Sequence, residues 1–393
     1  MTGPAAAVRS RPGQTASASV GMIGGGQLAR MTHQAAIGLG VELRVLTPDP
    51  AASAVRAGAR HVAGHPDDID AVLAFAADCD VVTFDHEQVP AAVISALVEA
   101  GHAVRPEPGA KRLAQDKGHA RRILDQAGFA VPSYAVVDAG DRRALERFAS
   151  DHGWPVVVKA PTGGYDGRGV AVVHRDDIDA ATNRLPASGD QWLLEAMVPI
   201  AVELAVLVAQ RPSGWWSAYP VVETVQHDGI CRELIMPARI PPALAEAATT
   251  LAVSVAQGSC ATGILAVELF VTPDGDLLVN ELAARPHNSG HATIEACRTS
   301  QFENHLRGVL DWPLGSTAMV APAAATVNIL GGELAVDLRR DLPTVLEDPR
   351  VHVHLYGKEP APGRKLGHLT ALAEEPEAAR EAAHRGLKAL TGR

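Results

Sequence analysis

The sequence lacks several features that would each point to a particular class of protein. Acidic residues outnumber basic ones, with 45 Asp plus Glu against 35 Lys plus Arg among 393 residues and a formal net charge of −10. This balance argues against a general binder of nucleic acid or of anionic membranes. No apolar run approaches the roughly 20 residues that a membrane-spanning helix needs. Residues 1–17 hold no hydrophobic core segment, so no secretory signal is expected.

Cysteine and lysine are both scarce. The four cysteines, Cys79, Cys231, Cys260 and Cys297, lie far apart and form no CxxC pair. That spacing favours a reduced, cytoplasmic protein whose cysteines hold no metal. Only six of the 35 basic residues are lysines, so lysine is not the default surface charge, and most of the six lie near glycine-rich or basic motifs.

The hydrophobic pattern predicts an α/β protein with three folded units. Residues 1–17 are rich in Ala, Gly, Ser and Pro, which is typical of a flexible tail. Residues 18–110 alternate short apolar strands with helical stretches of 10–15 residues, which indicates a parallel, doubly wound sheet. Residues 111–315 mix strands and helices, and residues 316–393 form a smaller β-rich unit closed by an Ala-rich helix.

Two local patterns concern the junction of the first two units. The segment AVRP, residues 103–106, is predicted to be the last strand of the first unit. The segment from Lys111 to Asp125 is predicted to be one helix, ended by Gly128.

A glycine turn, Gly24–Ala29, follows the first predicted strand and opens a helix, as in the dinucleotide-binding pattern G-x-G-x-x-A. Asp49 ends the next strand, where that pattern has a ribose-binding acid. Glycines at this point let the backbone approach an anion at a helix N-terminus. The pattern fits a nicotinamide-dependent oxidoreductase, and it fits a tight turn beside a different ligand equally well.

Lys159 ends a predicted strand, and the glycine-rich loop Gly163–Gly169 and a second strand follow it. A Walker A loop has its lysine after the glycines and leads into a helix, so that motif is excluded. A glycine flap with a lysine at its base suits the phosphates of a nucleoside triphosphate, because the lysine supplies charge and the flap amides complete a cradle. A long hairpin with an incidental lysine is the alternative.

Two glutamates, Glu268 and Glu281, lie on strands joined by Thr272–Asp276. If Asp274 and Gly275 form a two-residue turn, the two glutamates are direct cross-strand partners. Opposed carboxylates repel unless a cation lies between them, and Mg²⁺ accepts carboxylate and phosphate oxygens together. A three-residue turn with a glycine bulge would instead shift the pairing by one residue.

Two further polar segments are candidate site walls. The stretch after Glu281 runs Arg285, Pro286, His287, Asn288, Ser289, Gly290, His291, and such dense polar chemistry after a buried strand is typical of a site, with a plain loop as the alternative. Far along the chain, Lys358, Arg364 and Lys365 concentrate positive charge, which suits a phosphate and is explained as well by a solvated basic loop.

Five segments together carry a family resemblance: GMIGGGQLARM, VKAPTGGYDGRG, VELFVTPDGDLLVNELAARPHNSGH, QFENHLRGV and PGRKLGHL. In this combination and order, from about residue 20 to about residue 370, the chain resembles the 5-(carboxyamino)imidazole ribonucleotide synthase family. The resemblance implies an ATP-grasp fold, with a Rossmann-like pre-ATP-grasp domain at residues 18–110, the ATP-grasp domain at 111–315 and a small C-terminal domain at 316–393. It also implies a cytoplasmic homodimer.

The family chemistry is the ATP-dependent carboxylation of 5-aminoimidazole ribonucleotide in purine biosynthesis. ATP and bicarbonate form carboxyphosphate, Mg²⁺ is the metal, and the 5-amino group receives the carboxyl group. Such a reaction needs charge neutralisation, positioning and exclusion of water more than it needs a strong base. Another ATP-grasp carboxylase or ligase is the alternative within the fold.

The resemblance also assigns roles to residues of this chain. It places at ATP Arg112, Lys159, Gly164, Tyr165, Asp166, Gly167, Arg168, Gly169, Val170, Glu195, Ala196, Met197, Val198, Glu203, Gln226, Asn280 and Glu281. It places at the ribonucleotide Gly26, Gln27, Asn288, Ser289, Lys358, Arg364 and Lys365. It assigns catalysis to Tyr165, Arg285, His287 and Lys365, and the metal to Glu268 and Glu281. Many family members have histidine where this chain has Gln226, and here a histidine follows one place later.

Overall fold

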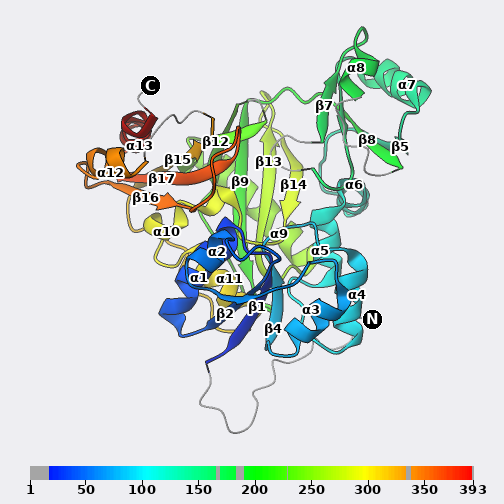
Figure 1. Ribbon diagram of the computed structural model, residues 1–393. Helices are drawn as coiled ribbons and strands as arrows, with labels where there is room; N and C mark the ends of the chain where they lie inside the picture. Colours follow the sequence, from blue (N-terminus) through cyan, green and yellow to red (C-terminus); the bar gives the residue numbers. More distant parts are fainter. Residues whose placement is uncertain (1–16, 165–168, 183–189, 228, 333–337, 392–393) are drawn as a thin grey trace.

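The computed structural model describes residues 17–164, 169–182, 190–227, 229–332 and 338–391. These residues form three β-sheets with helices packed around them (Figure 1). Tyr165, Asp166, Gly167 and Arg168, which the sequence assigns to the site, lie outside the described residues. Within the described part of the chain, no helix has the length and apolar character to cross a membrane.

The N-terminal unit is a parallel four-stranded sheet with strand order β3-β2-β1-β4, which confirms the doubly wound prediction. Its strands are β1 (Ser19–Ile23), β2 (Glu42–Leu46), β3 (Arg60–Val62) and β4 (Val81–Phe84). Its helices are α1 (Gln27–Leu39), α2 (Ser53–Arg56), α3 (Ile69–Ala76) and α4 (Ala91–Glu99). The predicted strand at residues 103–106 is wrong: only Val104 bridges to Val82, and the chain bends at Arg105 and Pro106 before the next helix begins.

The helix expected from Lys111 to Asp125 is in fact two helices, α5 (Pro108–Gln115) and α6 (Lys117–Gln126). Asp116 separates them with an extended backbone, at φ −116° and ψ 100°. Its carboxylate accepts a hydrogen bond from the backbone N–H of His119 at 2.9 Å, which is the geometry of a helix N-cap. The break puts Lys117 at the first position of the new helix.

A small antiparallel sheet, with order β5-β8-β6-β7, carries the glycine flap. Its strands are β5 (Tyr134–Asp138), β6 (Val156–Lys159), β7 (Val170–Val173) and β8 (Gln191–Ala196), and its helices are α7 (Arg142–His152) and α8 (Ile178–Thr182). Leu145 and Phe148 of α7 pack against Val156 and Val158, so the helix buries one face of the sheet. Lys159 ends β6 and pairs with Val170 at the start of β7, as the sequence predicts.

The third sheet has nine strands and forms the centre of the molecule. Its order is β14-β13-β9-β11-β12-β15-β17-β16, and β10 pairs with β9 at the side. The strands are β9 (Val202–Gln210), β10 (Trp216–Ala218), β11 (Val222–His227), β12 (Ile230–Met236), β13 (Gly263–Val271), β14 (Leu277–Ala283), β15 (Ala323–Leu330), β16 (Val351–Leu355) and β17 (Lys365–Ala373). The helices around it are α9 (Pro242–Ser259), the 3₁₀ helix η1 (Asn288–Gly290), α10 (Thr293–Ala296), α11 (Gln301–Val309), α12 (Leu338–Val345) and α13 (Pro376–Thr391).

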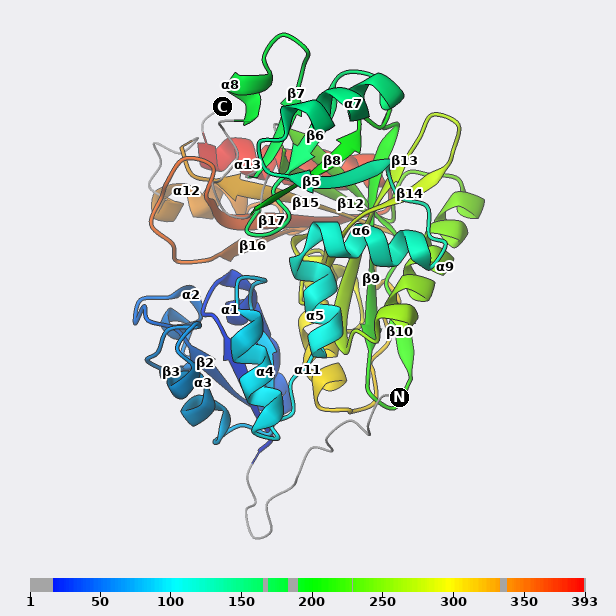
Figure 2. The same cartoon turned by 90° about the vertical axis from the view of Figure 1, so that its right-hand side faces the viewer.

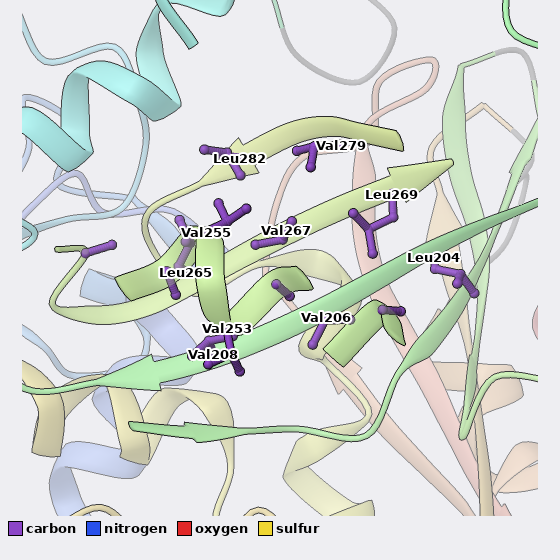
Figure 3. Close-up of a cluster of buried hydrophobic side chains, with 14 of the residues drawn as sticks. Leu204, Val206, Val208, Val253, Val255, Leu265, Val267, Leu269, Val279 and Leu282 are labelled. Atoms are coloured by element: carbon purple, nitrogen blue, oxygen red, sulfur yellow. The ribbon is translucent and has the colours of Figure 1, made fainter. Parts of the chain in front are cut away.

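Both faces of β9, in the central sheet, are buried. Alternate residues of a strand point to opposite faces, so Val206 and Val208 pack with Val253 and Val255 of α9 on one side (Figure 3). Leu207 of the same strand packs on the other side in a separate cluster. This explains why β9 reads as an almost continuous apolar run in the sequence.

The C-terminal strands continue the central sheet instead of forming a sheet of their own, because β15 pairs with β12. Figure 2 shows these strands and the N-terminal unit on the same side of the molecule. The two meet where the Ser53 hydroxyl donates a hydrogen bond to the Tyr356 carbonyl oxygen at 2.6 Å, and where Arg56 Nη1 donates to the Gly357 carbonyl oxygen at 2.8 Å. The loop after β16 therefore lies against α2.

Candidate active site

Glu268 and Glu281 meet at an irregularity of the β13–β14 hairpin. The turn has three residues closed by Thr272 and Asp276, whose N–H and carbonyl groups bond at 3.0 Å, and Gly275 has φ 88°. The two-residue turn is therefore wrong. The pairing changes between Val267 and Leu269, so that Glu268 lies opposite both Asn280 and Glu281 in a β-bulge.

The two carboxylates perturb each other as the sequence predicts for close neighbours. Burial, Glu281 and Glu203 raise the pKa of Glu268 to about 7. Burial opposes ionisation of Glu281 as well, but Lys117 and then Lys159 lower the pKa of Glu281 to about 2. Lys117 Nζ lies 2.5 Å from Glu281 Oε1. The negative charge of the pair therefore lies on Glu281, and Glu268 holds its proton more tightly than an ordinary glutamate.

This pair is a plausible set of Mg²⁺ donors only together with a phosphate ligand. Among the described residues, no three His, Cys, Asp or Glu side chains converge to hold a metal ion. Mg²⁺ is commonly held by one or two carboxylates plus substrate phosphates and water. Because a cation between Glu268 and Glu281 would relieve their repulsion, the two residues fit such an ion.

Lys159 lies beside this pair, inside a network of buried charges. Its Nζ is 2.8 Å from Glu195 Oε2 and 3.2 Å from Asn280 Oδ1. Glu195 is also bound by Arg121, whose Nε lies 2.5 Å from Glu195 Oε1. Burial alone would raise the pKa of Glu195, but Lys159 and Arg121 lower it below its ordinary value. The Glu195 side chain thus points at cations and not toward a base.

The neighbouring strands bring more of the predicted ATP residues to the same face. Glu203 of β9 pairs with Thr224 of β11. Burial raises the pKa of Glu203, against the opposing charge of Lys159 and a hydrogen bond from Gln226. Met197, in the segment between β8 and β9, is 42% exposed and therefore open to a ligand. Ala196, the last residue of β8, and Val198 flank it.

Lys117 lies at the carboxylate of Glu281, and the sequence analysis assigned Lys117 no role in the site. Arg112, the predicted phosphate cation, is exposed on α5, and its contact with ATP stays a prediction. The signal for Lys117 was available in the sequence: Asp116 is an N-cap residue type, and a helix starting there exposes Lys117 at its beginning.

A second cluster holds Arg285 and His287. Arg285 Nε lies 2.7 Å from Glu87 Oε1, and His287 Nε2 lies 3.6 Å from Glu268 Oε1. His287 Nδ1 accepts a hydrogen bond from the Ser289 N–H at 3.3 Å and contacts the Ser289 hydroxyl at 2.9 Å, which leaves Nε2 as the ring nitrogen that faces Glu268. Glu87 was missed, although it follows the carboxyl end of β4, where ligands bind in open α/β sheets.

Gln301 fixes the His287 backbone, accepting from its N–H at 2.8 Å and donating to its carbonyl oxygen at 2.6 Å. Asn288 is 9% exposed, and neither polar atom of its side chain has a hydrogen-bond partner among the described residues. An amide buried without a partner costs roughly 1–3 kcal/mol. It is therefore available to a bound ligand.

Arg364 and Lys365 point to different places, although the sequence interpretation put both at one phosphate. Arg364 is exposed and lines a cavity of about 600 Å³ together with Lys358 and Gly26. Lys365 is 8% exposed. Its charge partly offsets the rise in the pKa of Glu268 and contributes to the lowered pKa of His291. Successive residues of extended chain face opposite sides, which separates the two cations.

The same cavity reaches the glycine turn. The contacts of this turn with Asp85 argue against a dinucleotide at this place. The N–H groups of Gly26 and Ala29 donate to the two carboxylate oxygens of Asp85, at 2.5 and 3.0 Å. The protein's own carboxylate thus fills the anion position at the start of α1. A Cβ on Gly26 would lie 2.5 Å from Asp85 Oδ2, so this contact requires glycine. Lys358 Nζ reaches over the turn and bonds Gln27 Oε1.

Comparison with known proteins identifies related domains along the whole chain. The ribonucleotide synthetase preATP-grasp domain matches residues 17–115, the ATP-grasp domain matches residues 122–302, and the phosphoribosylaminoimidazole carboxylase C-terminal domain matches residues 324–382. The chain is 48% identical over 364 residues to the N5-carboxyaminoimidazole ribonucleotide synthase of Mycobacterium tuberculosis, which covers 91% of this chain and 84% of the relative.

Solved structures agree with these relatives. The carboxyaminoimidazole ribonucleotide synthase of Aspergillus clavatus complexed with ATP has a TM-score of 0.88 and 32% identity, over 95% of this chain and 98% of that chain. The N5-carboxyaminoimidazole synthase of that organism in complex with ADP and 5-aminoimidazole ribonucleotide has a TM-score of 0.86 and 31% identity, over 95% of this chain and 98% of that chain.

Proposed function

This chain belongs to the N5-carboxyaminoimidazole ribonucleotide synthase family, and on that premise we propose how its own residues divide the reaction. The enzyme is an ATP-grasp ligase of purine biosynthesis that carboxylates 5-aminoimidazole ribonucleotide with ATP and bicarbonate. The observation that carries the division is that the cations have different surroundings: Lys159 lies beside Glu195 and Asn280, whereas Lys358 lines the cavity at the glycine turn.

Lys159 and Lys117 hold the phosphates of ATP at the edge of the central sheet. Both are attached to carboxylates that a bound phosphate can partly replace, Lys159 to Glu195 and Lys117 to Glu281. Glu268 and Glu281 hold Mg²⁺, which when bound neutralises phosphate charge. The backbone of Glu195–Val198 pairs with the adenine base, Glu203 binds the ribose, and Gln226 orients Glu203 through their hydrogen bond.

The glycine flap covers the transferred phosphate. Gly164, Gly169 and Val170 belong to it, and so do Tyr165, Asp166, Gly167 and Arg168, which lie outside the described residues. A flap that excludes water protects carboxyphosphate from hydrolysis while it forms and reacts. Lys159 lies at its base, so flap and phosphate cation act at the same point.

The ribonucleotide reaches from the cavity of Lys358 toward Lys159. Lys358 and Arg364 bind its phosphate in the 600 Å³ cavity, with Gly26 and Gln27 as the wall. A phosphate monoester is well matched by two cationic donors of this kind. Asn288, with its unused amide, binds the sugar or the ring.

At the reacting end, Arg285 and Lys365 attract the carboxyphosphate anion, and His287 orients it. His287 presents its Nε2, and Ser289 holds the ring in that orientation through its N–H. Positioned cations of this kind stabilise charge that develops during transfer.

Phosphate release with and without 5-aminoimidazole ribonucleotide tests this assignment. The purified protein is expected to release phosphate from ATP in the presence of Mg²⁺ and bicarbonate, faster when the ribonucleotide is added, and to form the N-carboxylated product. Thermal shifts with ATP, with Mg²⁺ and with NAD provide the second readout. A shift with NAD and no turnover of ATP would overturn the proposal.

Two further properties follow from the family and stay proposals. The protein is cytoplasmic, supported by the absence of any disulfide among its four cysteines, all of which lie in the described residues. It is a homodimer, which sedimentation equilibrium would test directly.

A further inference from the structure

Arg121 is a buried arginine to which none of the roles above applies. It lies on α6, between the small sheet and the central sheet, and its side chain is 3% exposed. Its Nε contacts Glu195 Oε1 at 2.5 Å, and its Nη1 donates to the carbonyl oxygen of Val279 at 3.2 Å. A guanidinium taken out of water costs several kcal/mol unless partners compensate it. Its position therefore calls for a physical reason.

The contacts of Arg121 close a ring that includes the phosphate cation. Arg121 binds one oxygen of Glu195, and Lys159 binds the other at 2.8 Å. Lys159 also reaches Asn280 Oδ1 at 3.2 Å, and Asn280 is joined by a peptide bond to Val279, the backbone partner of Arg121. The ring thus ties α6, the small sheet and β14 together at the edge where Lys159 lies.

Charge balance explains what Arg121 does in this ring. Glu195 carries one negative charge, and Lys159 and Arg121 carry one positive charge each, so one positive charge remains for a ligand. Without Arg121, Glu195 and Lys159 would form a neutral buried pair. In a poorly solvated site such a pair is tight, and the lysine would have little net attraction for phosphate.

We propose that Arg121 is a positioning residue for ATP: by occupying one oxygen of Glu195, it keeps the charge of Lys159 available to the phosphates. This rests on the proposed role of Lys159 as a phosphate cation. Arg121 itself touches no substrate in this assignment. It acts through Glu195, and its anchor on Val279 keeps it aligned with the strand that carries Asn280 and Glu281.

The test separates charge from structure with a double variant. Arg121→Met is expected to raise the dissociation constant and KM for ATP on the order of tenfold, with KM for 5-aminoimidazole ribonucleotide nearly unchanged. Arg121→Met combined with Glu195→Gln restores the surplus positive charge, so ATP affinity is expected to return to within about threefold of wild type. For Arg121→Lys, which keeps the charge, the dissociation constant for ATP is expected to lie between those of wild type and Arg121→Met.

The matched control is Arg122→Met, because Arg122 is the next residue of the same helix and is exposed. It is expected to leave both KM values unchanged. ATP binding is measured by calorimetry and turnover by phosphate release, at a temperature well below the melting transition of every variant. If Arg121→Met does not fold, the double variant, which carries the same single surplus positive charge as wild type, is compared with wild type, and ATP affinities within about threefold of each other are expected.

Failure of the inference and failure of the proposed function give different results. A double variant that binds ATP as weakly as Arg121→Met means that Arg121 has a structural role only, and it overturns the inference. Normal ATP binding in Arg121→Met overturns it as well. Normal ATP kinetics in Lys159→Ala would instead refute the role of Lys159, and with it the assignment of the phosphate site.

Discussion

Replacing Glu268 by Gln is expected to stabilise the protein without ligands, by an amount that grows as the pH rises from about 4.5 to about 7. Burial and the neighbouring Glu281 raise the pKa of Glu268 to about 7, against an ordinary value of 4.5. A shift of this size corresponds to about 3.5 kcal/mol at most, since one pKa unit is about 1.4 kcal/mol. The side chain is 27% exposed, and solvent screening reduces the effect to about 2 kcal/mol.

The pH dependence follows from the sign of the shift. The folded protein binds a proton at Glu268 more tightly than the unfolded chain does, so folding is penalised when that proton is lost. The penalty is absent below pH 4.5, grows as the pH rises and is complete above about pH 7. Glutamine carries no charge at any of these values. Glu268→Gln is therefore expected to raise the melting temperature by about 2–3 °C at pH 8 and by less than about 1 °C at pH 5.

Thermal unfolding at several pH values measures this difference, with Glu246→Gln as the control because Glu246 is an exposed residue of α9. Adding ATP alone and then ATP with Mg²⁺ gives a second readout. Wild type should gain an additional shift from Mg²⁺, and Glu268→Gln should lose that increment. Destabilisation of Glu268→Gln by equal amounts at pH 5 and pH 8 would refute the reasoning, because it would make Glu268 a structural residue.

Three further predictions concern the remaining cations. Lys159→Ala is expected to weaken ATP binding and reduce turnover on the order of 100-fold, which steady-state kinetics of a folded variant would check. Arg364→Ala is expected to raise KM for 5-aminoimidazole ribonucleotide about tenfold with kcat and ATP binding nearly unchanged, whereas a drop in kcat alone would contradict its place at the phosphate. Arg285→Ala is expected to lower kcat as well as kcat/KM, since it lies beside His287; an effect confined to KM would argue against a contact with the transferred group.

Much of the ATP end was predictable from the sequence because its signals are local. The lysine before the glycine flap, the strand–turn–strand pattern around Glu268 and Glu281, and the polar stretch after Glu281 are each contained in one short segment. Hydrophobic alternation and glycine chemistry decide such segments before any distant contact forms. The same holds for the parallel sheet of the N-terminal unit, whose strands and helices alternate regularly.

The structure departs from the sequence predictions at two places near these motifs, the hairpin turn and the helix break. Both the two-residue and the three-residue turn were compatible with Pro273–Gly275, and only the complete hairpin shows the second irregularity at Glu268. The helix break at Asp116 depended on one side chain capping a new helix, which competes with simple helical propensity at that point.

By itself, then, the sequence determined most of the element types, the pair of metal-binding candidates and the family. The tertiary structure alone decided which charges share a carboxylate: Arg121 with Lys159 on Glu195, and Lys117 on Glu281. It alone separated Arg364 from Lys365 and joined the C-terminal strands to the central sheet. The reason is physical: a local pattern depends on neighbours in the chain, whereas a buried ion pair joins residues far apart in the chain, whose meeting depends on how the sheets and helices pack.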